Sequence, residues 1–436
     1  MPKHADQVRG LADPEPRARS ATRLPTAPRD VTDVVRSGLC SGCGLCASLA
    51  GPEKIRMGLN MKGNMRPLVL DPVDEDVNRT ILASCPGATV TGPGAPGGVA
   101  THPVWGPIRE MHRSWSAEEQ VRHHAAAGGT LTGLGRYLLD SGSVSAVLHV
   151  RASEETPWLT EAQVSRCATE VYSGAQSRYG PAAPLVHVRA LLDAGERFAV
   201  IAKPCDISAL RALARVDPRV EEQIPYMLTL FCGGVLNAHI PRAMIRHHGV
   251  KESEVTTFRF RGDGWPGPHR VETSDGRTFD VPYGSAYTGR PWGYDMQFRC
   301  KICPDAVGEV ADISAPDGWL LADGRPLYDE APGRNVAVVR TERGRELLAA
   351  AVAAGYIELA PVSMAELEAM HGNHPARKVG APATFLALRV SRQPRPSIRG
   401  YRTWRSVRRA GVRTSWQQFR GTLRRVLRGD NREPVI

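Results

Sequence analysis

Four cysteines in the first hundred residues carry the clearest chemical pattern of this sequence. Cys40, Cys43 and Cys46 stand at two-residue spacing in CSGCGLC, and Cys85 is followed directly by a proline. Three close thiolates completed by a distant Cys-Pro match the ligation pattern of a 4Fe-4S cluster. Zinc is the alternative, but tetrahedral zinc sites usually take pairs of cysteines from two separate loops. We therefore expect an iron-sulfur cluster, with the glycines between the cysteines letting the backbone turn tightly around it.

Four of the other five cysteines form a weaker second pattern. Cys205 lies in KPCD, Cys232 in LFCGG, and Cys300 and Cys303 in FRCKIC. Cluster ligands need only be neighbours in space, so these thiols predict a second 4Fe-4S cluster. A Cys-x-x-Cys pair also binds zinc or cycles as a redox dithiol, and a single cysteine is often a small core residue. Cys167, in SRCATE, fits neither group and is expected to be a core or incidental residue.

Composition limits the compartment and the class of protein. The chain has 436 residues, of which 42% are hydrophobic, enough for two or three domains with a sizeable core. No apolar run approaches the roughly 20 residues that cross a bilayer, and the N-terminus lacks an apolar signal core. Nine cysteines in such patterns indicate metal ligation in a reducing compartment rather than disulfides. The sequence thus predicts a cytoplasmic location.

The net charge of +11 is concentrated at the C-terminus. Residues 389–436 contain fourteen arginines and two acidic residues, a net charge of +12, which leaves the rest of the chain at −1. Tryptophan, valine and leucine are interspersed among these arginines, so parts of the segment fit a basic amphipathic helix. Such a helix would contact an acidic partner or an anionic membrane surface, or bind nucleic acid without specificity. A solvated terminus that packs loosely on its own domain is the simpler alternative.

Composition shifts and hydrophobic patterns divide the chain into five segments. Residues 1–36 lack hydrophobic periodicity and are predicted to be disordered. We expect a small cluster domain at residues 37–90, a linker containing TGPGAPGG at 91–110, an α/β domain at 111–388 and the basic tail at 389–436.

Within residues 111–388, short apolar runs alternate with helical patterns. Strands are predicted at 144–150, 197–202, 225–231, 335–340 and 356–360, and helices at 184–194, 206–214, 342–354 and 363–371. This alternation predicts an α/β core with a largely parallel sheet. Residues 255–283 change to the strand period around Asp275-Gly276, a strong hairpin turn, and predict a β-hairpin insertion. Cys205 and Cys232 fall at strand ends, where open α/β sheets gather ligands.

Several motifs occur in the order found in one protein family. They are CSGCGLC, GGTLTGL at 128–134, SRYGP at 177–181, KPCDISALR at 203–211, LFCGG, CKIC and ADIS at 311–314. With this set the chain resembles the coenzyme F-420 hydrogenase/dehydrogenase beta-subunit family, which includes hydroxymethyl chlorophyll reductase and ferredoxin-dependent vinyl reductases. The resemblance covers roughly residues 37–320. It implies a small N-terminal 4Fe-4S domain followed by a larger α/β domain that binds FAD and the second cluster.

The resemblance also suggests where the flavin binds. Glycines that let backbone approach a ring or pyrophosphate, nearby hydroxyls and two cations form the predicted flavin contacts: Gly128, Gly129, Thr130, Thr132, Ser177, Arg178, Tyr179 and Lys203. The Lys203 ammonium would stabilise a reduced anionic flavin or its phosphates. Taken alone, a Gly-Gly pair is equally typical of a helix start or of close packing.

The function that the resemblance implies is electron transfer. An iron-sulfur flavoprotein oxidoreductase would pass electrons between a one-electron donor such as ferredoxin, two 4Fe-4S clusters and FAD, and exchange hydride with an organic acceptor such as coenzyme F-420. No catalytic residue can be assigned; Asp206, Asp312 and His269 only lie near motifs. One alternative is an electron-input subunit of a larger hydrogenase or dehydrogenase. Another is a zinc-stapled nucleic-acid-binding protein, although the nearly neutral body makes specific nucleic-acid binding unexpected.

Overall fold

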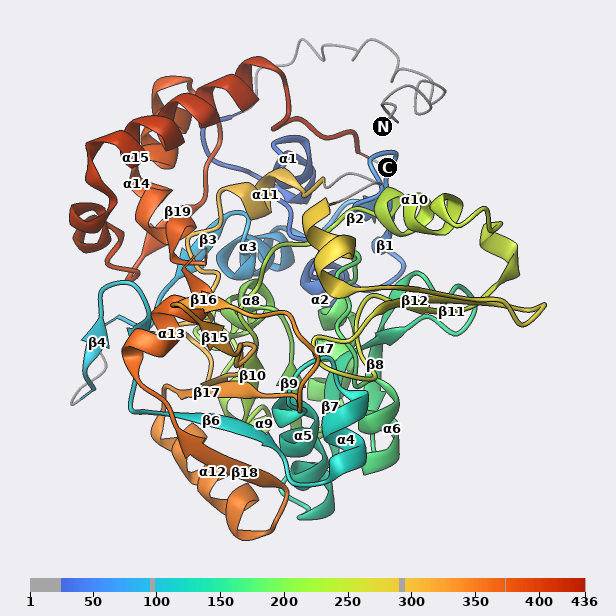
Figure 1. Cartoon of the computed structure of the whole chain (residues 1–436). Helices are drawn as coiled ribbons and strands as arrows, with labels where there is room; N and C mark the ends of the chain where they lie inside the picture. Colours follow the sequence, from blue (N-terminus) through green and yellow to red (C-terminus); the bar gives the residue numbers. More distant parts are fainter. Residues whose placement is uncertain (1–24, 95–98, 290–294, 373, 436) are drawn as a thin grey trace, which may run out of the picture.

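The computed structural model describes residues 25–94, 99–289, 295–372 and 374–435, and an eight-stranded mixed sheet forms its centre (Figure 1). The strand order is β18 (Ile357–Pro361), β6 (Glu110–Ser116), β17 (Asn335–Val339), β14 (Ile313–Ser314), β10 (Met227–Thr229), β9 (Phe198–Ile201), β7 (Ala146–Ala152) and β8 (Thr160–Ser165). The predicted α/β class is confirmed, as are the five predicted strands. The sheet is parallel only from β14 to β7, however, because β6, β17, β18 and β8 pair antiparallel at its two sides.

Strand side chains alternate between two helical layers. Phe198 and Val200 face a core shared with α7 (Val188–Asp193) and α8 (Pro204–Leu213), whereas Ala199 faces the opposite core. That second core includes α5 (Thr130–Asp140) and α12 (Glu342–Ala353). The period of two along β9 therefore places helices on both faces of the sheet. The predicted helices at 184–194, 206–214, 342–354 and 363–371 are all present, the last as α13 (Met364–His371).

The N-terminal segment packs against the α7 and α8 side of the sheet. It consists of α1 (Val31–Arg36), α2 (Leu45–Ala50), β1 (Ile55–Leu59), β2 (Met65–Val69), α3 (Glu75–Ser84) and β3 (Thr89–Thr91), and β1 and β2 form an antiparallel pair. Leu45, Ile55 and Ile81 share a core with the sheet.

Helix α1 lies inside the segment predicted to be disordered, so that prediction is wrong for residues 31–36. The Asp30 side chain caps the helix by accepting from the Asp33 amide, and Val31, Val34 and Val35 are buried on one face. Residues 1–24 lie outside the described part of the chain. The predicted linker also contains structure. It forms the antiparallel strands β4 (Thr101–His102) and β5 (Gly106–Pro107), and Trp105 in the turn that connects them is buried.

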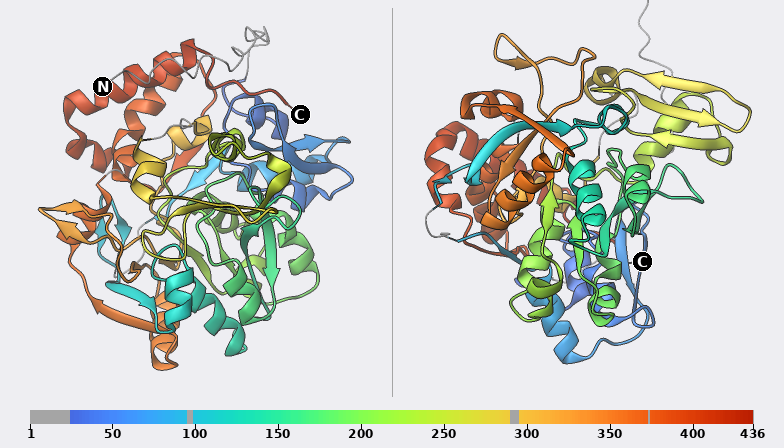
Figure 2. Two further views of the ribbon diagram at one scale, coloured as in Figure 1. Left: turned by 45° about the vertical axis from the view of Figure 1, so that its right-hand side comes forward. Right: turned by 90° about the horizontal axis from the view of Figure 1, so that it is seen from below.

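The predicted β insertion is confirmed and contains one strand more than a hairpin. β11 (Val255–Arg259), β12 (His269–Thr273) and β13 (Thr278–Val281) form an antiparallel sheet, with Gly276 at a φ of +83° in the turn between β12 and β13. This sheet and α10 (His239–His247) share a separate core and project from the main body (Figure 2).

The C-terminal segment is integrated into the fold. Helices α14 (Pro375–Val390) and α15 (Thr403–Leu427) lie side by side at one edge of the molecule (Figure 2), and β19 (Ser397–Arg399) pairs in parallel with β3. The predicted basic helix is therefore present, and it is tied to the N-terminal segment. None of the described helices combines the length and apolar character needed to cross a bilayer.

Candidate functional site

The first cysteine group comprises Cys40, Cys43, Cys46 and Cys85. All four side chains line one small cavity, walled by apolar residues that include Val34, Leu45 and Ile81. Cys40 and Cys43 are buried, and Cys85 ends α3. The structure thus brings together the four thiols that the sequence predicted as ligands.

Two glycines shape the loop that carries this group. Gly42 and Gly44 have φ values of +75° and +85°, the left-handed region that glycine adopts without strain. The Gly42 amide donates to Cys40 Sγ at 3.4 Å, and a Cβ on Gly44 would lie 2.6 Å from Val186 Cγ1. Both positions therefore need glycine, one for the turn around the sulfur and one for close packing.

Burial sets the protonation of the thiols. It raises the pKa of Cys43 well above its usual range and the pKa of Cys85 to about 11, with neighbouring thiols adding to both shifts. Within the described residues, no three His, Cys, Asp or Glu side chains converge as they would on a single metal ion. The thiols instead surround a cavity. Ligation of a cluster there would release their protons and remove this burial penalty.

The second cysteine group comprises Cys205, Cys232, Cys300 and Cys303. Cys205 lies in the first turn of α8, Cys232 follows β10, Cys300 lies in α11 (Phe298–Lys301), and Cys303 follows that helix. The four are close enough that the charges of Cys232 and Cys303 raise the pKa of Cys205, after the larger effect of burial. Cys300 and Cys303 act likewise on Cys232, whose pKa rises to about 12 mainly because it is buried. Cys167 stays apart and is exposed, so it is not a core residue.

A cavity of about 250 Å³ lies beyond the carboxyl ends of β9, β10 and β14, beside the second cysteine group. Such strand ends are the usual ligand-binding edge of an α/β sheet. Seven of the eight predicted flavin contacts line it: Gly129, Thr130, Thr132, Ser177, Arg178, Tyr179 and Lys203. Cys232 also lines this cavity, so the cavity and the second cysteine group share a wall.

Gly128 is the predicted contact that does not line the cavity. A Cβ on Gly128 would lie 2.8 Å from Arg334 Cα, so this glycine serves close packing. Gly129, at a φ of +75°, starts α5 and lines the cavity. The Gly-Gly pair thus combines a packing role at its first residue with a helix start that faces the cavity at its second.

Arg178 gives the cavity a positive charge that pairs with no carboxylate in the described part of the chain. Its guanidinium donates to the carbonyl oxygens of Pro157, Leu159 and Phe258 at 2.6–2.9 Å and to Thr160 Oγ1 at 3.4 Å, none of which is a carboxylate. Burial lowers its pKa to about 10, so it remains charged at neutral pH. A buried cation without a carboxylate partner favours an anionic ligand. Together with the first turn of α5, which also lines the cavity, Arg178 fits the pyrophosphate of a dinucleotide.

Lys203 is neutralised by its neighbour. Its ammonium contacts the Asp206 carboxylate at 2.7 Å, and the Asp206 side chain has no exposed area. Of the three acid–base candidates, Asp206 alone lines the cavity. Asp312 is held by Arg211, by the Met227 amide and by the Thr341 hydroxyl.

His269 is completely buried in β12, where its Nδ1 lies 2.7 Å from the Arg259 carbonyl oxygen. Asp312 and His269 are thus structural residues.

Sequence reasoning missed the side chains that lie between the two cysteine groups. Arg66, Gln297 and Arg299 are buried. Gln297 contacts the Ser41 carbonyl oxygen and the Cys300 sulfur, and Arg66 contacts Gln297 in turn. Arg299 contacts the Pro86 carbonyl oxygen, next to Cys85. Gln297 and Arg299 directly precede the CKIC motif, but neither residue type is a cluster ligand and no spacing identified them. Arg66 lies in β2, far from every motif.

Comparison with known proteins identifies the family of this chain. Residues 111–189 match the family described as coenzyme F420 hydrogenase/dehydrogenase, beta subunit N-term, and residues 195–365 match its C terminus. The coenzyme F420 hydrogenase subunit beta of Methanothermobacter thermautotrophicus is 25% identical over 59% of this chain and 86% of its own length. The F420-dependent formate dehydrogenase 1 subunit beta of Methanococcus maripaludis is 25% identical over 57% of this chain and 61% of its own length.

Two further similar proteins align with different shares of this chain. The coenzyme F420-dependent sulfite reductase of Methanocaldococcus jannaschii is 23% identical over 73% of this chain, but this chain spans less than half of it, 46%. Among solved structures, a chain of the F420-reducing [NiFe] hydrogenase complex from Methanosarcina barkeri aligns at 20% identity with a TM-score of 0.49, covering 66% of this chain and 96% of that one.

Proposed function

Since this chain belongs to the coenzyme F420 hydrogenase/dehydrogenase beta-subunit family, we propose that it is an iron-sulfur flavoprotein that transfers electrons in an oxidoreductase. One observation carries the proposal. The chain brings together two groups of four cysteines, and the second group adjoins a cavity that contains Arg178. We infer two 4Fe-4S clusters and one FAD per chain, in a reducing compartment such as the cytoplasm.

The chain's own residues would position these groups. The first cysteine group lies in a largely apolar pocket, and the second adjoins the cavity through Cys232. Arg178 supplies the charge that an anionic dinucleotide needs, and Tyr179 lines the same wall. Bound there, the clusters would supply one-electron chemistry, and the flavin would link it to two-electron exchange with an organic acceptor.

Three relatives carry coenzyme F420 in their names, and this supports coenzyme F420 or another planar organic molecule as the acceptor for this chain. Beside the cavity, Tyr283 and Trp319 form an aromatic group around the Arg261 guanidinium, at 4.9 and 5.0 Å from the ring centres. Arg261 is paired with Asp317, which lines the cavity. This aromatic side is where we place a planar acceptor.

For the partner, we infer that an acidic one-electron carrier docks on α15. The helix contains no acidic residue, and Arg413, Arg420 and Arg424 are exposed together with Trp416. The inner side of this helix reaches the first cysteine group, because Val426 packs against the hydrophobic core that contains Cys40. A carrier held by this helix would therefore lie near the first cysteine group. The exposed apolar side chains alternate with arginines, an arrangement that suits a charged protein surface better than deep insertion into lipid.

The proposal is tested by anaerobic purification followed by assays of iron, acid-labile sulfide, zinc and flavin on one sample. Iron with sulfide and a yellow flavin would support it, whereas zinc without sulfide or flavin would refute it. Activity of the purified chain with an artificial electron donor and acceptors would separate a self-sufficient enzyme from a subunit. A subunit that only feeds electrons into a larger hydrogenase or dehydrogenase would reduce no organic acceptor until its partner is added.

A further inference from the structure

The two cysteine groups are joined by the side chain of Gln297. Its Nε2 donates to the Ser41 carbonyl oxygen at 3.4 Å and to Cys300 Sγ at 3.3 Å. Ser41 directly follows Cys40 in the chain. One buried amide group therefore contacts the backbone beside a thiol of the first group and the sulfur of a thiol of the second.

A second contact runs parallel to the first. The Arg299 guanidinium donates through two nitrogens to the Pro86 carbonyl oxygen, at 3.1 and 2.9 Å. Pro86 follows Cys85, and Arg299 precedes Cys300. The short segment at residues 297–300 thus reaches backbone carbonyls beside two different thiols of the first group.

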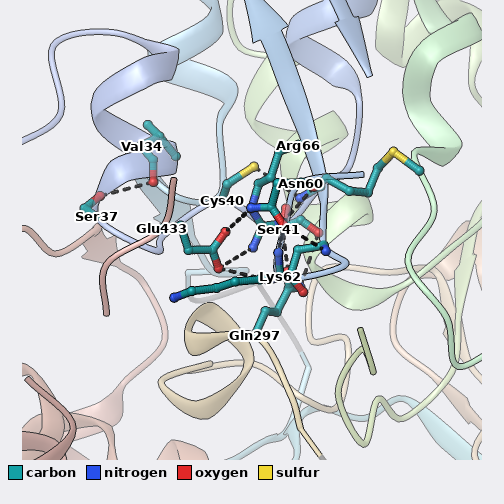
Figure 3. A network of polar contacts seen from close by, with 12 residues as sticks. Val34, Ser37, Cys40, Ser41, Asn60, Lys62, Arg66, Gln297 and Glu433 are labelled. Carbon is teal, nitrogen blue, oxygen red and sulfur yellow. Dashed lines mark hydrogen bonds and ion pairs between the residues drawn. The ribbon is translucent and has the colours of Figure 1, made fainter. Parts of the chain in front are cut away.

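A buried ion pair holds Gln297 in place (Figure 3). Arg66 Nη1 donates to Gln297 Oε1 at 2.9 Å, while its Nη2 donates to the Glu433 carboxylate at 2.8 Å. The Arg66 and Glu433 side chains are 0% and 2% exposed. The Asn60 and Asn64 amides also donate to this carboxylate, which belongs to the fourth residue from the C-terminus.

Packing alone is a weak reason for this arrangement. Burial of an ion pair costs desolvation energy that its attraction often fails to repay, and apolar residues of similar volume would stabilise the fold as well or better. The pair lies instead where charge would change during turnover, since the Arg66 cation interacts with both Cys40 and Cys300. Fixed charges and hydrogen bonds to sulfur are the means by which proteins set cluster potentials.

We propose that Gln297 is the positioning residue that couples the two clusters, and that the Arg66–Glu433 pair orients it and balances the charge between them. This inference rests on the proposed two-cluster function. One electron would leave the cluster held by the first group and enter the cluster held by the second, with no bond formed and no proton moved. The electron comes from a low-potential one-electron carrier protein.

The test compares Gln297→Leu with Gln393→Leu in the full-length chain, purified anaerobically. Gln393 is a matched control because it makes the same type of amide contacts, to Ser391 and Asn431, without touching a cysteine. A hydrogen bond to a charged group is worth enough to change a redox equilibrium constant about tenfold, or about 59 mV for one electron. We expect Gln297→Leu to lower the midpoint potential of one cluster by about this amount and to slow electron arrival at the flavin after flash reduction.

A second pair of variants removes charge but keeps shape. Glu433→Gln should raise a cluster midpoint potential, opposite in sign to Gln297→Leu, because the Arg66 cation loses its counterion; the control Asp430→Asn should leave it unchanged. Unchanged potentials and electron-transfer rates in both Gln297→Leu and Glu433→Gln, with iron content intact, would overturn the proposal. If Gln297→Leu loses iron, Glu433→Gln alone tests the proposal: a raised midpoint potential supports it, and an unchanged or lowered one overturns it. A wild-type chain without iron would instead refute the two-cluster function itself.

Discussion

Replacement of Arg178 by methionine should weaken flavin binding. Arg178 is half-buried and lines the cavity, and its guanidinium contacts no carboxylate among the described residues, so its charge is available to an anionic ligand. At separations of roughly 6–8 Å and an effective dielectric constant of about 20, one such charge contributes about 2–3 kcal/mol to binding. The expected loss in FAD affinity is therefore roughly 30- to 150-fold.

Arg178→Lys is the matched control. Both variants lose the fork of hydrogen bonds to Pro157, Leu159 and Phe258, but lysine keeps the charge. The difference between them isolates the charge effect. Fluorescence quenching of FAD titrated into flavin-depleted protein gives the dissociation constants, and thermal unfolding shows whether each variant is folded. Folded Arg178→Met that binds FAD as tightly as the wild type would refute the assignment of this cavity to the flavin.

Three other perturbations test separate parts of the account. Cys85→Ser should halve the iron content and leave flavin content unchanged, because it disrupts the first cysteine group alone; retention of all iron would exclude Cys85 as a ligand. Arg413→Glu should weaken binding of an acidic carrier about tenfold at low salt, and by less at high salt, whereas Arg246→Glu on α10 should have no effect. If Arg413→Glu weakens binding to anionic lipid vesicles more than binding to the carrier, the helix binds a membrane instead. Burial lowers the pKa of His269 to about 4, below the 6.5 of an unfolded histidine, so its contribution to stability is complete above pH 6.5 and falls as the pH drops toward 4. His269→Gln should therefore flatten the loss of unfolding free energy across this range by up to about 3 kcal/mol, measured by chemical denaturation, and an unchanged pH profile would contradict a buried neutral His269.

The strands and helices of the α/β core were predictable because their patterns are local. Residues 198–202 form a continuous apolar run, and such runs became β9 and β10 at the centre of the sheet. The antiparallel strands β6 and β8 were not predicted, because Arg113 and Glu161 make these strands look polar. Most side chains of both strands are half-buried, and this weakens the apolar alternation by which a strand is recognised in a sequence.

The candidate site was predictable only where motifs carried it. Spacing alone grouped Cys40, Cys43 and Cys46, whereas the convergence of Cys205 and Cys232 with Cys300 depends on the fold of the sheet. Residues between the groups could not be found in this way. Arg66 and Glu433 are 367 positions apart in the chain, and only tertiary packing brings them together.

The most direct test of the central claim is spin quantitation by electron paramagnetic resonance after full chemical reduction of the anaerobically purified chain, together with flavin quantitation. Eight cysteines in two groups predict two spins from 4Fe-4S clusters and one flavin per chain. A single spin per chain would contradict the second cluster, and no spin in iron-free protein would contradict the electron-transfer function altogether.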